Sequence, residues 1–230
     1  MTAPASSGDA VAVVVARNEA ASIGRTVASA SGIPTISRVV VVDGDSTDGT
    51  AERAGEAGAS VIPAPHRGGK GGALEHAFDL LPPSRAYLLV DGDVGETAAA
   101  AAPLLAPVLS GELDLCIGRL PRQDVGGFGM VKRVAGRLIA SQGPFRPSEP
   151  LSGQRAATSP VLEACRPFAR GFGLETAMTM DAVRLGFRVG ERAVEMHHRS
   201  TGMNAAGFLH RGRQGADIVR AALPRLAGVR

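Results

Sequence analysis

Apolar runs rich in Val and Leu alternate with polar turns and helical stretches along the first half of the chain. Runs without polar interruption are typical of strands buried on both faces of a parallel sheet. The predicted strands are residues 11–16, 39–42, 60–62 and 86–90. Helices are expected up to about residue 30, near 51–57 and over 74–81. This alternation predicts an α/β domain, a three-layer sandwich around a central, mostly parallel sheet.

The second half of the chain is less regular, and its pattern predicts fewer strands. Strands are expected over 113–117 and 188–196, and helices over 131–141, 172–185 and 207–222. An irregular stretch from 144 to 150 leads into the turn Leu151–Gln154. Because no linker interrupts the chain, we expect a single domain over residues 10–222. Residues 1–9 are expected to form a disordered leader, and residues 223–230 a tail.

The composition is that of an ordinary globular protein. Charged residues make up 20% and apolar residues 44% of the chain, which argues against a wholly disordered one. The formal net charge is +3, and residues 181–230 alone carry nine Arg against four acidic groups, a local balance of +5. So mild an excess suits an anionic substrate or a lipid surface, whereas nucleic-acid binding requires a stronger one. No nucleic-acid partner is expected.

Cysteine usage and hydropathy favour a cytoplasmic protein. The two cysteines lack a CxxC spacing, which disfavours both a disulfide framework and a zinc knot. The N-terminal residues lack the basic and apolar regions of a signal peptide. The longest weakly polar stretch, residues 97–109, is too short to span a bilayer. We therefore expect cytoplasmic localisation and no transmembrane anchor.

Polar groups follow three predicted strands, at the sheet edge where α/β proteins bind ligands. These groups are Arg17-Asn18-Glu19, Asp43-Gly44-Asp45 and Asp91-Gly92-Asp93. Two carboxylates separated by one small residue suit a hard divalent cation that also binds phosphate oxygens. A solvated turn is the alternative for a DxD sequence. Either aspartate of the second group can accept a hydrogen bond from a uracil-like base, and the same loop can cap the next helix.

A glycine-rich segment, residues 66–74, surrounds Lys70 at the start of a predicted helix. Helix-start N–H groups and an ammonium form a natural phosphate site, although a flexible surface loop is the alternative. The segment is not a Walker A loop, because Gly71 follows Lys70 where Ser or Thr is required. His197-His198-Arg199 ends the last predicted strand. One imidazole there can complete a metal site with the DxD group, while a structural role is the commoner one for a His pair.

These motifs resemble those of the family 2-type glycosyltransferases in order and rough spacing. The matching segments are ARNE at 16–19, VVDGDSTDGT at 41–50, GKGGAL at 69–74 and LLVDGDVG at 88–95. The family commonly has DDGS where this chain has DGDS. Two later segments, EPLSGQRA at 149–156 and GFGLETAMTMDA at 171–182, are similar to the glucosyl-3-phosphoglycerate synthases and their soluble actinobacterial relatives.

The resemblance implies a GT-A, Rossmann-like fold in a single domain, with Mg²⁺ or Mn²⁺ as cofactor. Residues 10–118 would bind the nucleotide sugar, and residues 119–222 the acceptor. The implied reaction moves a hexose such as glucose from a nucleotide-diphosphate sugar, UDP-linked, to an acceptor. That acceptor would be a small phosphorylated or acidic molecule, or a lipid phosphate.

The resemblance also implies roles for individual residues. The residues expected to hold the nucleotide sugar are Ala16, Arg17, Glu19, Asp43, Asp45, Lys70, Asp91 and Gly92. The expected metal ligands are Asp93, His198 and Asp91. The residues expected at the sugar and acceptor are Leu151, Ser152, Gly153, Gln154, Arg199 and Arg211. Asp93, Glu175 and His198 are the expected catalytic residues, with Glu175 acting as a general base or as an acceptor for a sugar hydroxyl.

Two other hypotheses are a sugar-1-phosphate nucleotidylyltransferase and a non-catalytic nucleotide-sugar-binding protein. The first carries a Gly-rich loop directly after the first strand, and here Gly24 comes too late. A dinucleotide-dependent oxidoreductase fails for the same reason. The intact DxD group, Lys70 and His198 argue against a non-catalytic protein. A homodimer is the commonest assembly and is kept as a possibility.

Overall fold

The computed structural model describes residues 10–121, 129–196 and 205–227, and a seven-stranded sheet lies at its centre. The strands are β1 (Ala10–Ala16), β2 (Ile36–Asp43), β3 (Ser60–Pro63), β4 (Ala86–Asp91), β5 (Leu115–Arg119), β6 (Arg155–Thr158) and β7 (Val189–Ala193). Their order across the sheet is β3-β2-β1-β4-β6-β5-β7. All neighbours pair in parallel except at β6, which is antiparallel to β4 and β5. The prediction of a mostly parallel central sheet is confirmed.

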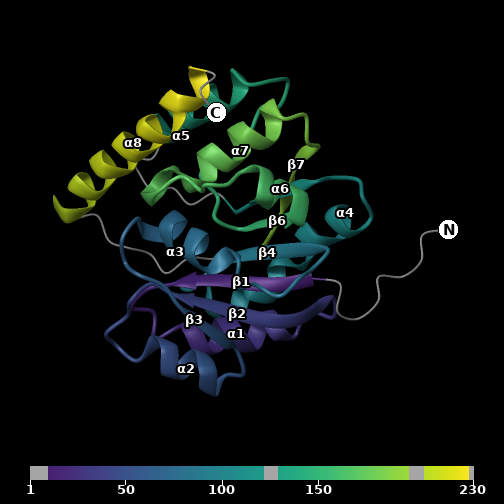
Figure 1. The fold of residues 1–230 in the computed structure, drawn as a ribbon, viewed down its shortest axis with the longest axis vertical. Helices are drawn as coiled ribbons and strands as arrows, with labels where there is room; N and C mark the ends of the chain where they lie inside the picture. The colour runs from purple at the N-terminus through teal and green to yellow at the C-terminus, as the bar shows by residue number, and fades with distance from the viewer. Residues whose placement is uncertain (1–9, 122–128, 197–204, 228–230) are drawn as a thin grey trace.

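Helices cover both faces of the sheet (Figure 1). One face carries α1 (Ile23–Ser31), α2 (Thr50–Glu56), the 3₁₀ helix η1 (Gly95–Leu104) and α4 (Leu105–Leu109). The other face carries α3 (Gly69–Phe78), α6 (Ser159–Ala164) and α7 (Leu174–Arg184), which follows the short 3₁₀ helix η2 (Gly171–Gly173). Two further helices, α5 (Gly129–Ala140) and α8 (Ala205–Leu226), pack on α7. None of the described helices is both long enough and apolar enough to cross a membrane.

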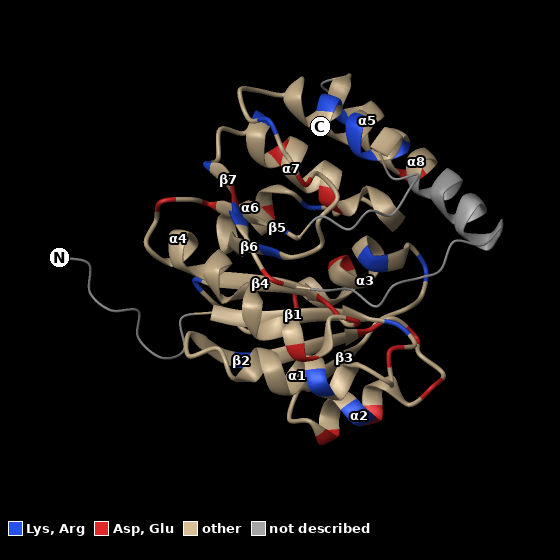
Figure 2. Ribbon diagram, turned by 180° about the vertical axis from the view of Figure 1, so that it is seen from behind, with Lys and Arg blue, Asp and Glu red and all other residues tan. Residues whose placement is uncertain are grey.

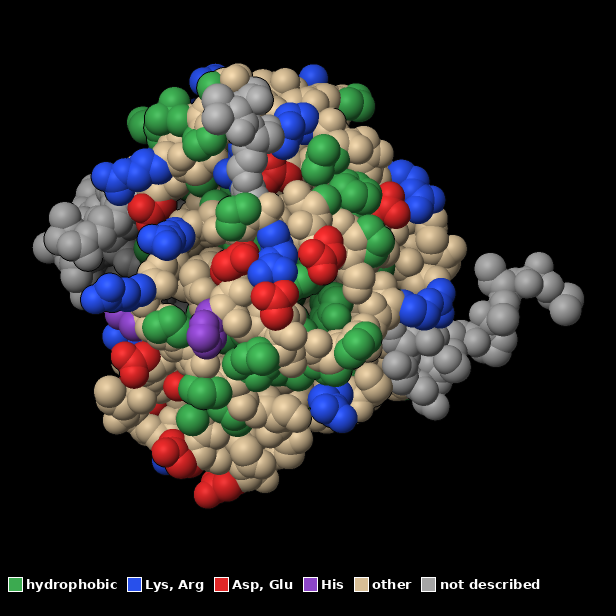
Figure 3. Space-filling model, viewed as in Figure 1, with side chains coloured by type: hydrophobic (Ala, Val, Ile, Leu, Met, Phe, Trp, Pro, Cys, Tyr) green, Lys and Arg blue, Asp and Glu red, His purple; other side chains and the backbone are tan. Residues whose placement is uncertain are grey.

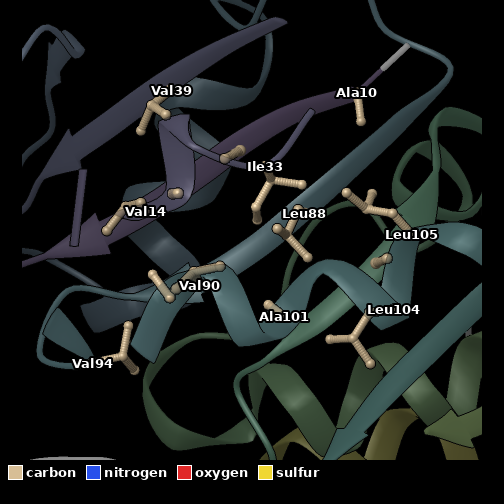
Figure 4. Packing of buried hydrophobic residues seen from close by; sticks show 14 of the residues in the cluster. Ala10, Val14, Ile33, Val39, Leu88, Val90, Val94, Ala101, Leu104 and Leu105 are labelled. Carbon is tan, nitrogen blue, oxygen red and sulfur yellow. The ribbon is translucent and has the colours of Figure 1, made fainter. Parts of the chain in front are cut away.

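Alternate residues of each central strand pack against opposite helical layers. In β1, Ala12 and Val14 face the layer of α1 and η1, whereas Val11 and Val13 face the layer of α3 and α7. Figure 4 shows the first of these clusters, in which Leu88 and other strand residues pack with residues of η1 and α4. Because side chains on both faces are buried, the strands require uninterrupted apolar runs rather than polar alternation. This explains why the sequence pattern predicts them.

The sequence pattern does not predict β6. Its four residues, Arg155–Thr158, contain two alanines and no large apolar side chain. The strand is held by its neighbours in the sheet, since Ala157 lies opposite Tyr87 of β4 and opposite Leu115 of β5. Tertiary pairing therefore overrides a weak local preference.

Residues 223–226 belong to α8, although we expected a tail there. The helix continues because Arg225, which is 5% exposed, donates two hydrogen bonds to Asp181 Oδ2 of α7 at 2.8 and 2.6 Å. Ala222 is also buried, against Ile139 and Met180. The expected leader, residues 1–9, lies outside the described residues.

Replacing Arg225 with methionine should destabilise the protein. Asp181 is 2% exposed, so the variant removes the closest ion-pair partner of a buried carboxylate, whereas Arg184 lies further away at 3.4 Å. Loss of one partner of a buried ion pair costs about 3 kcal/mol. The matched control is Arg220→Met on the same helix, because Arg220 is exposed and lies 3.7 Å from Asp217. Urea unfolding should show a lower midpoint for the first variant and nearly no shift for the second; equal midpoints would contradict this view of α8.

The nearly balanced charge of the chain is visible on its surface. In Figure 3, acidic and basic side chains stand next to one another near the middle of the face shown. Several surface ion pairs connect segments far apart in sequence, such as Arg188 with Asp114 at 2.8 Å. Exposed pairs of this kind contribute little to stability, at most about 1 kcal/mol each.

Candidate active site

The polar groups that follow β1, β2 and β4 meet at one edge of the sheet, as their positions in the sequence indicate. The register places Ala16 opposite Asp43 and Val15 opposite Asp91. In Figure 2, acidic and basic segments gather at this edge, beside α3. The parallel arrangement therefore brings residues 17–19, 43–45 and 91–93 within reach of one ligand.

Hydrogen bonds join the loop after β1 to the loop after β2. Asn18 N donates to Ser46 Oγ at 2.9 Å, and Asn18 Oδ1 accepts from Thr47 N at 3.0 Å. Glu19 N donates to Thr50 Oγ1 at 2.8 Å, and Ala20 N to Asp48 Oδ2 at 3.0 Å. The Thr50 hydroxyl also holds the pKa of the Asp48 carboxyl below its ordinary value. The ARNE segment with Ala20 and the STDGT segment are therefore joined by these four hydrogen bonds.

The two aspartates expected to read the base differ sharply in environment. Asp43 is 6% exposed, and its Oδ2 accepts from Ser46 N at 3.1 Å. Its Oδ1 is buried and has no hydrogen-bond partner among the described residues. Asp45 is exposed and has a left-handed backbone, with φ of 62°. Asp43 thus offers a buried acceptor, whereas Asp45 shapes the turn.

The DxD turn after β4 is fastened to α1. The Ser22 and Thr26 hydroxyls both donate to the Gly92 carbonyl at 3.0 Å, and Ser22 Oγ also lies 3.0 Å from Glu19 Oε2. A Cβ at position 92 would lie 2.8 Å from Ala16 Cβ, so this close approach requires glycine. The predicted residues Ala16, Glu19 and Gly92 are therefore in contact.

Lys70 lies between two carboxylates from distant parts of the chain. Its Nζ is 2.5 Å from Asp91 Oδ1 and 3.0 Å from Glu175 Oε1. Gln154 holds the same aspartate, because its Nε2 donates to Asp91 Oδ2 at 2.7 Å. We call Lys70, Asp91, Gln154 and Glu175 the Lys70 cluster. All four are residues that the sequence analysis singled out.

The electrostatics of the cluster keep Lys70 charged. Burial disfavours the ammonium, but attraction to Asp91 and then to Glu175 outweighs it and raises the pKa of Lys70 above its ordinary value. The side chain is 24% exposed, so it is still reachable by a ligand. Lys70 is therefore a fixed positive charge rather than a base at neutral pH.

Lys70 lines three cavities, a small one of about 10 Å³ and two larger ones, which we call the first and second cavities. The first, of about 150 Å³, is lined by Val15, Ala16, Arg17, Gly44, Pro65, His66, Gly69, Lys70 and Ala73. The second, of about 230 Å³, is lined by Lys70, Asp91, Leu151, Gly153, Phe172, Glu175 and Ile218. A Cβ on Gly153 would overlap Asp91 Oδ2 and lie 2.7 Å from Lys70 Nζ, so glycine leaves room for the cluster in this arrangement.

Sequence reasoning missed part of both walls. Phe172 and Ile218 line the second cavity, and His66 lines the first. Phe172 stands inside the GFGLET segment, which was singled out for Glu175 alone. Ile218 is 1% exposed and reaches the cavity from α8. In the sequence, an isoleucine in a predicted helix cannot be distinguished from an ordinary core residue.

The expected metal ligands are described only in part. Asp93 is half-buried at the end of the DxD turn, and both oxygens of Asp91 are engaged by Lys70 and Gln154. Within residues 10–121, 129–196 and 205–227, no three His, Cys, Asp or Glu side chains gather as a metal site. His198 and Arg199 lie outside the described residues, as does the side chain of Arg211 on α8.

Solved structures of glucosyl-3-phosphoglycerate synthase from Mycobacterium tuberculosis have this fold. The complex with phosphoglyceric acid matches with a TM-score of 0.77 and 27% identity, covering 94% of this chain and 79% of that one. The complex with Mn²⁺, UDP and phosphoglyceric acid matches with a TM-score of 0.78 and 26% identity, covering 94% and 78%. Another complex of the same enzyme holds Mg²⁺ and UDP. The architecture is that of the GT-A glycosyltransferases, as the resemblance implied.

Sequence comparison leads to the same class. The glucosyl-3-phosphoglycerate synthase of M. tuberculosis is 31% identical over 242 residues, 90% of this chain and 72% of the relative. The glycosyltransferase AglJ of Haloferax volcanii is 32% identical over 154 residues, 65% of this chain and half of the relative's length. Residues 11–154 match the family model of glycosyl transferase family 2. The chain belongs to this family and is a glycosyltransferase.

Proposed function

We propose that this glycosyltransferase moves glucose from UDP-glucose to a small phosphorylated acceptor, with a divalent cation bound at Asp93. The observation that carries the proposal is the position of Lys70, which contacts Asp91 and Glu175 and lines both cavities. The Lys70 ammonium would therefore face a nucleoside diphosphate in the first cavity and the transferred sugar in the second. The similar mycobacterial synthase has been solved with UDP-glucose and phosphoglyceric acid, and with glycerol 3-phosphate.

The first cavity suits the nucleotide part of the donor. Ala16 and Arg17 line it, and Glu19 lies beside them for the ribose. The buried Asp43 Oδ1 is an acceptor that matches the imide N–H of uracil. Lys70 would then meet the diphosphate as a point charge.

The residues at the DxD turn fit a divalent cation. Carboxylate oxygens are the ligands that Mg²⁺ and Mn²⁺ prefer, and such ions take one or two carboxylates together with substrate phosphates. Asp93 would supply the first ligand and His198 a further one, whereas Asp91 stays with Lys70 and Gln154. When bound, the cation neutralises negative charge on the departing diphosphate.

The second cavity suits the sugar and the acceptor. Glu175 and Asp91 offer carboxylate oxygens to hydroxyl groups, and Leu151, Phe172 and Ile218 form an apolar wall opposite them. An acceptor hydroxyl attacks C1 of the glucose, the bond from C1 to the diphosphate oxygen breaks, and UDP leaves. Glu175 is the residue placed to receive the hydroxyl proton as a general base, or to orient a sugar hydroxyl.

Product analysis tests the proposal. The purified protein is incubated with UDP-glucose and Mn²⁺ and with 3-phosphoglycerate, glycerol 3-phosphate or a polyprenyl phosphate. We expect acceptor-dependent release of UDP and a glucosylated phosphate ester by mass spectrometry. Pyrophosphate formed from UTP and glucose 1-phosphate would instead indicate a nucleotidylyltransferase, and UDP-glucose binding without any product would indicate a non-catalytic protein. A product only from polyprenyl phosphate would move the acceptor to the lipid class.

Asp43→Asn should change base selectivity. The amide places an N–H donor where the imide N–H of uracil needs an acceptor, and loss of one charged hydrogen bond weakens UDP binding by about tenfold to a hundredfold. Cytosine presents an acceptor at this position, so affinity for CDP should rise relative to UDP. Calorimetry with both nucleotides checks this, with the exposed Asp45→Asn as the control. A larger effect at Asp45 would assign base recognition to that residue instead.

A further inference from the structure

Arg155 is the largest fully buried polar side chain near the Lys70 cluster. It is 1% exposed, and its Nε donates to the Ser152 carbonyl at 2.8 Å. Its Nη1 donates to Thr179 Oγ1 at 2.8 Å, and its Nη2 to the Pro150 carbonyl at 3.5 Å. No carboxylate of the described residues lies within ion-pair distance of it. A buried guanidinium whose hydrogen bonds go only to neutral acceptors is costly, although attraction to Glu175 offsets part of the cost.

The acceptors of Arg155 belong to the two segments that carry the cluster. The turn from Pro150 to Ser152 leads into Gly153, which fits against Asp91 and Lys70, and into Gln154, which binds Asp91. Thr179 lies one helical turn after Glu175 in α7, and its hydroxyl donates to the Glu175 carbonyl at 2.8 Å. The guanidinium therefore spans from the segment holding Asp91 to the helix holding Glu175.

We infer that the hydrogen bond between Arg155 and Thr179, which we call the brace, fixes the distance between Asp91 and Glu175. Because both carboxylates bind Lys70, the brace also fixes the position of Lys70 between the two cavities. Arg155 is thus a positioning residue for sugar transfer, and this role rests on the proposed function. The planar fork of guanidinium donors suits the task, because it fixes three acceptors in one geometry, which an ammonium cannot do. Burial lowers the pKa of Arg155 to about 10, which leaves the side chain charged at neutral pH.

Thr179 offers a test that leaves the buried charge in place. Thr179→Val keeps the side-chain volume but removes the hydroxyl that links Arg155 to α7. Thr176→Val is the matched control on the same helix, because the Thr176 hydroxyl is equally buried and has no hydrogen-bond partner among the described residues. Thr179→Ser restores the hydroxyl and serves as the rescue.

Steady-state kinetics with UDP-glucose and calorimetry with UDP distinguish positioning from stability. A misplaced reacting group slows the chemical step by up to about a hundredfold, so we expect Thr179→Val to lower kcat by about tenfold. The KM for UDP-glucose and the Kd for UDP should change much less than kcat, because Thr179 lines neither cavity and Lys70 keeps its charge. Thr176→Val should match the wild type, and Thr179→Ser should recover most of the lost kcat.

The outcomes separate this inference from the proposed function. An inactive wild-type protein overturns the proposed function itself. If the wild type is active and Thr179→Val and Thr176→Val have equal kcat, the positioning role of Arg155 and Thr179 is overturned. A Thr179→Val variant that loses UDP affinity in proportion to kcat, or that Thr179→Ser does not rescue, assigns Arg155 a purely structural role and also overturns it.

Discussion

Asp93→Ala is expected to lower kcat by at least about a hundredfold, the scale of a lost charge-stabilising contact in a transition state. The reason is electrostatic. Asp93 is the carboxylate of the DxD turn that the Lys70 cluster does not use, so removing it takes away the proposed ligand of the cation. The fall in kcat should exceed any loss of UDP-glucose binding, because charge on the diphosphate grows as the sugar departs.

The control for this variant is Glu96→Ala. Glu96 lies three residues further along, and its side chain is 84% exposed and pairs with Arg25 at 3.8 Å. Its removal should leave turnover within about twofold, as for most surface substitutions. Initial rates of UDP release with and without EDTA provide the readout. Near-native turnover by EDTA-treated Asp93→Ala protein would refute the role given to this residue.

Lys70→Met is expected to lower kcat/KM for UDP-glucose by about a hundredfold to a thousandfold, since it removes the fixed cation that the proposed function places at the diphosphate. Methionine keeps the apolar stem, so the cavity walls remain. The variant also leaves Asp91 and Glu175 facing one another without the charge that separates them. The chain has one other lysine, which makes Lys132→Met a close control: Lys132 pairs with Glu149 at 2.6 Å and lines neither cavity.

The pH dependence of the same contact has a defined sign. Folding raises the pKa of Lys70 above its ordinary 10.5, so the stabilisation that the ion pairs provide is complete below that value and is lost only above it. The rate should therefore show no titration of Lys70 from neutral to mildly alkaline pH. The pH profiles of the wild type and of Lys132→Met check this. The prediction is contradicted if both proteins lose activity below pH 10.5 on the alkaline side and Lys70→Met does not.

The sequence predicted the elements whose local pattern and tertiary role agree. The runs at 11–16, 39–42 and 86–90 became β1, β2 and β4 within a few residues, because strands buried on both faces have to be apolar throughout. β6 could not be predicted, because its Arg and its two alanines have no local preference for a strand. The strand forms through its pairing with β4 and β5.

The candidate site could be predicted as a set of residues but not as a set of contacts. The strand ends with Glu19, Asp43 and Asp91 follow from the parallel sheet, whose carboxyl edge collects them. The contact between Lys70 and Glu175 joins residues 105 positions apart, and no pattern in the sequence reports such a distance. The difference between Asp43 and Asp45 is likewise one of burial, which the motif alone does not contain.

A crystal structure with Mn²⁺, UDP and 3-phosphoglycerate tests most directly whether Lys70 stands where donor and acceptor meet. We expect the anomalous signal of manganese at the Asp93 carboxylate, uracil at Asp43 and the diphosphate at Lys70, with the phosphorylated acceptor in the cavity of Glu175 and Phe172. Manganese bound away from Asp93, or UDP seated outside the cavity lined by Ala16 and Arg17, would contradict the account.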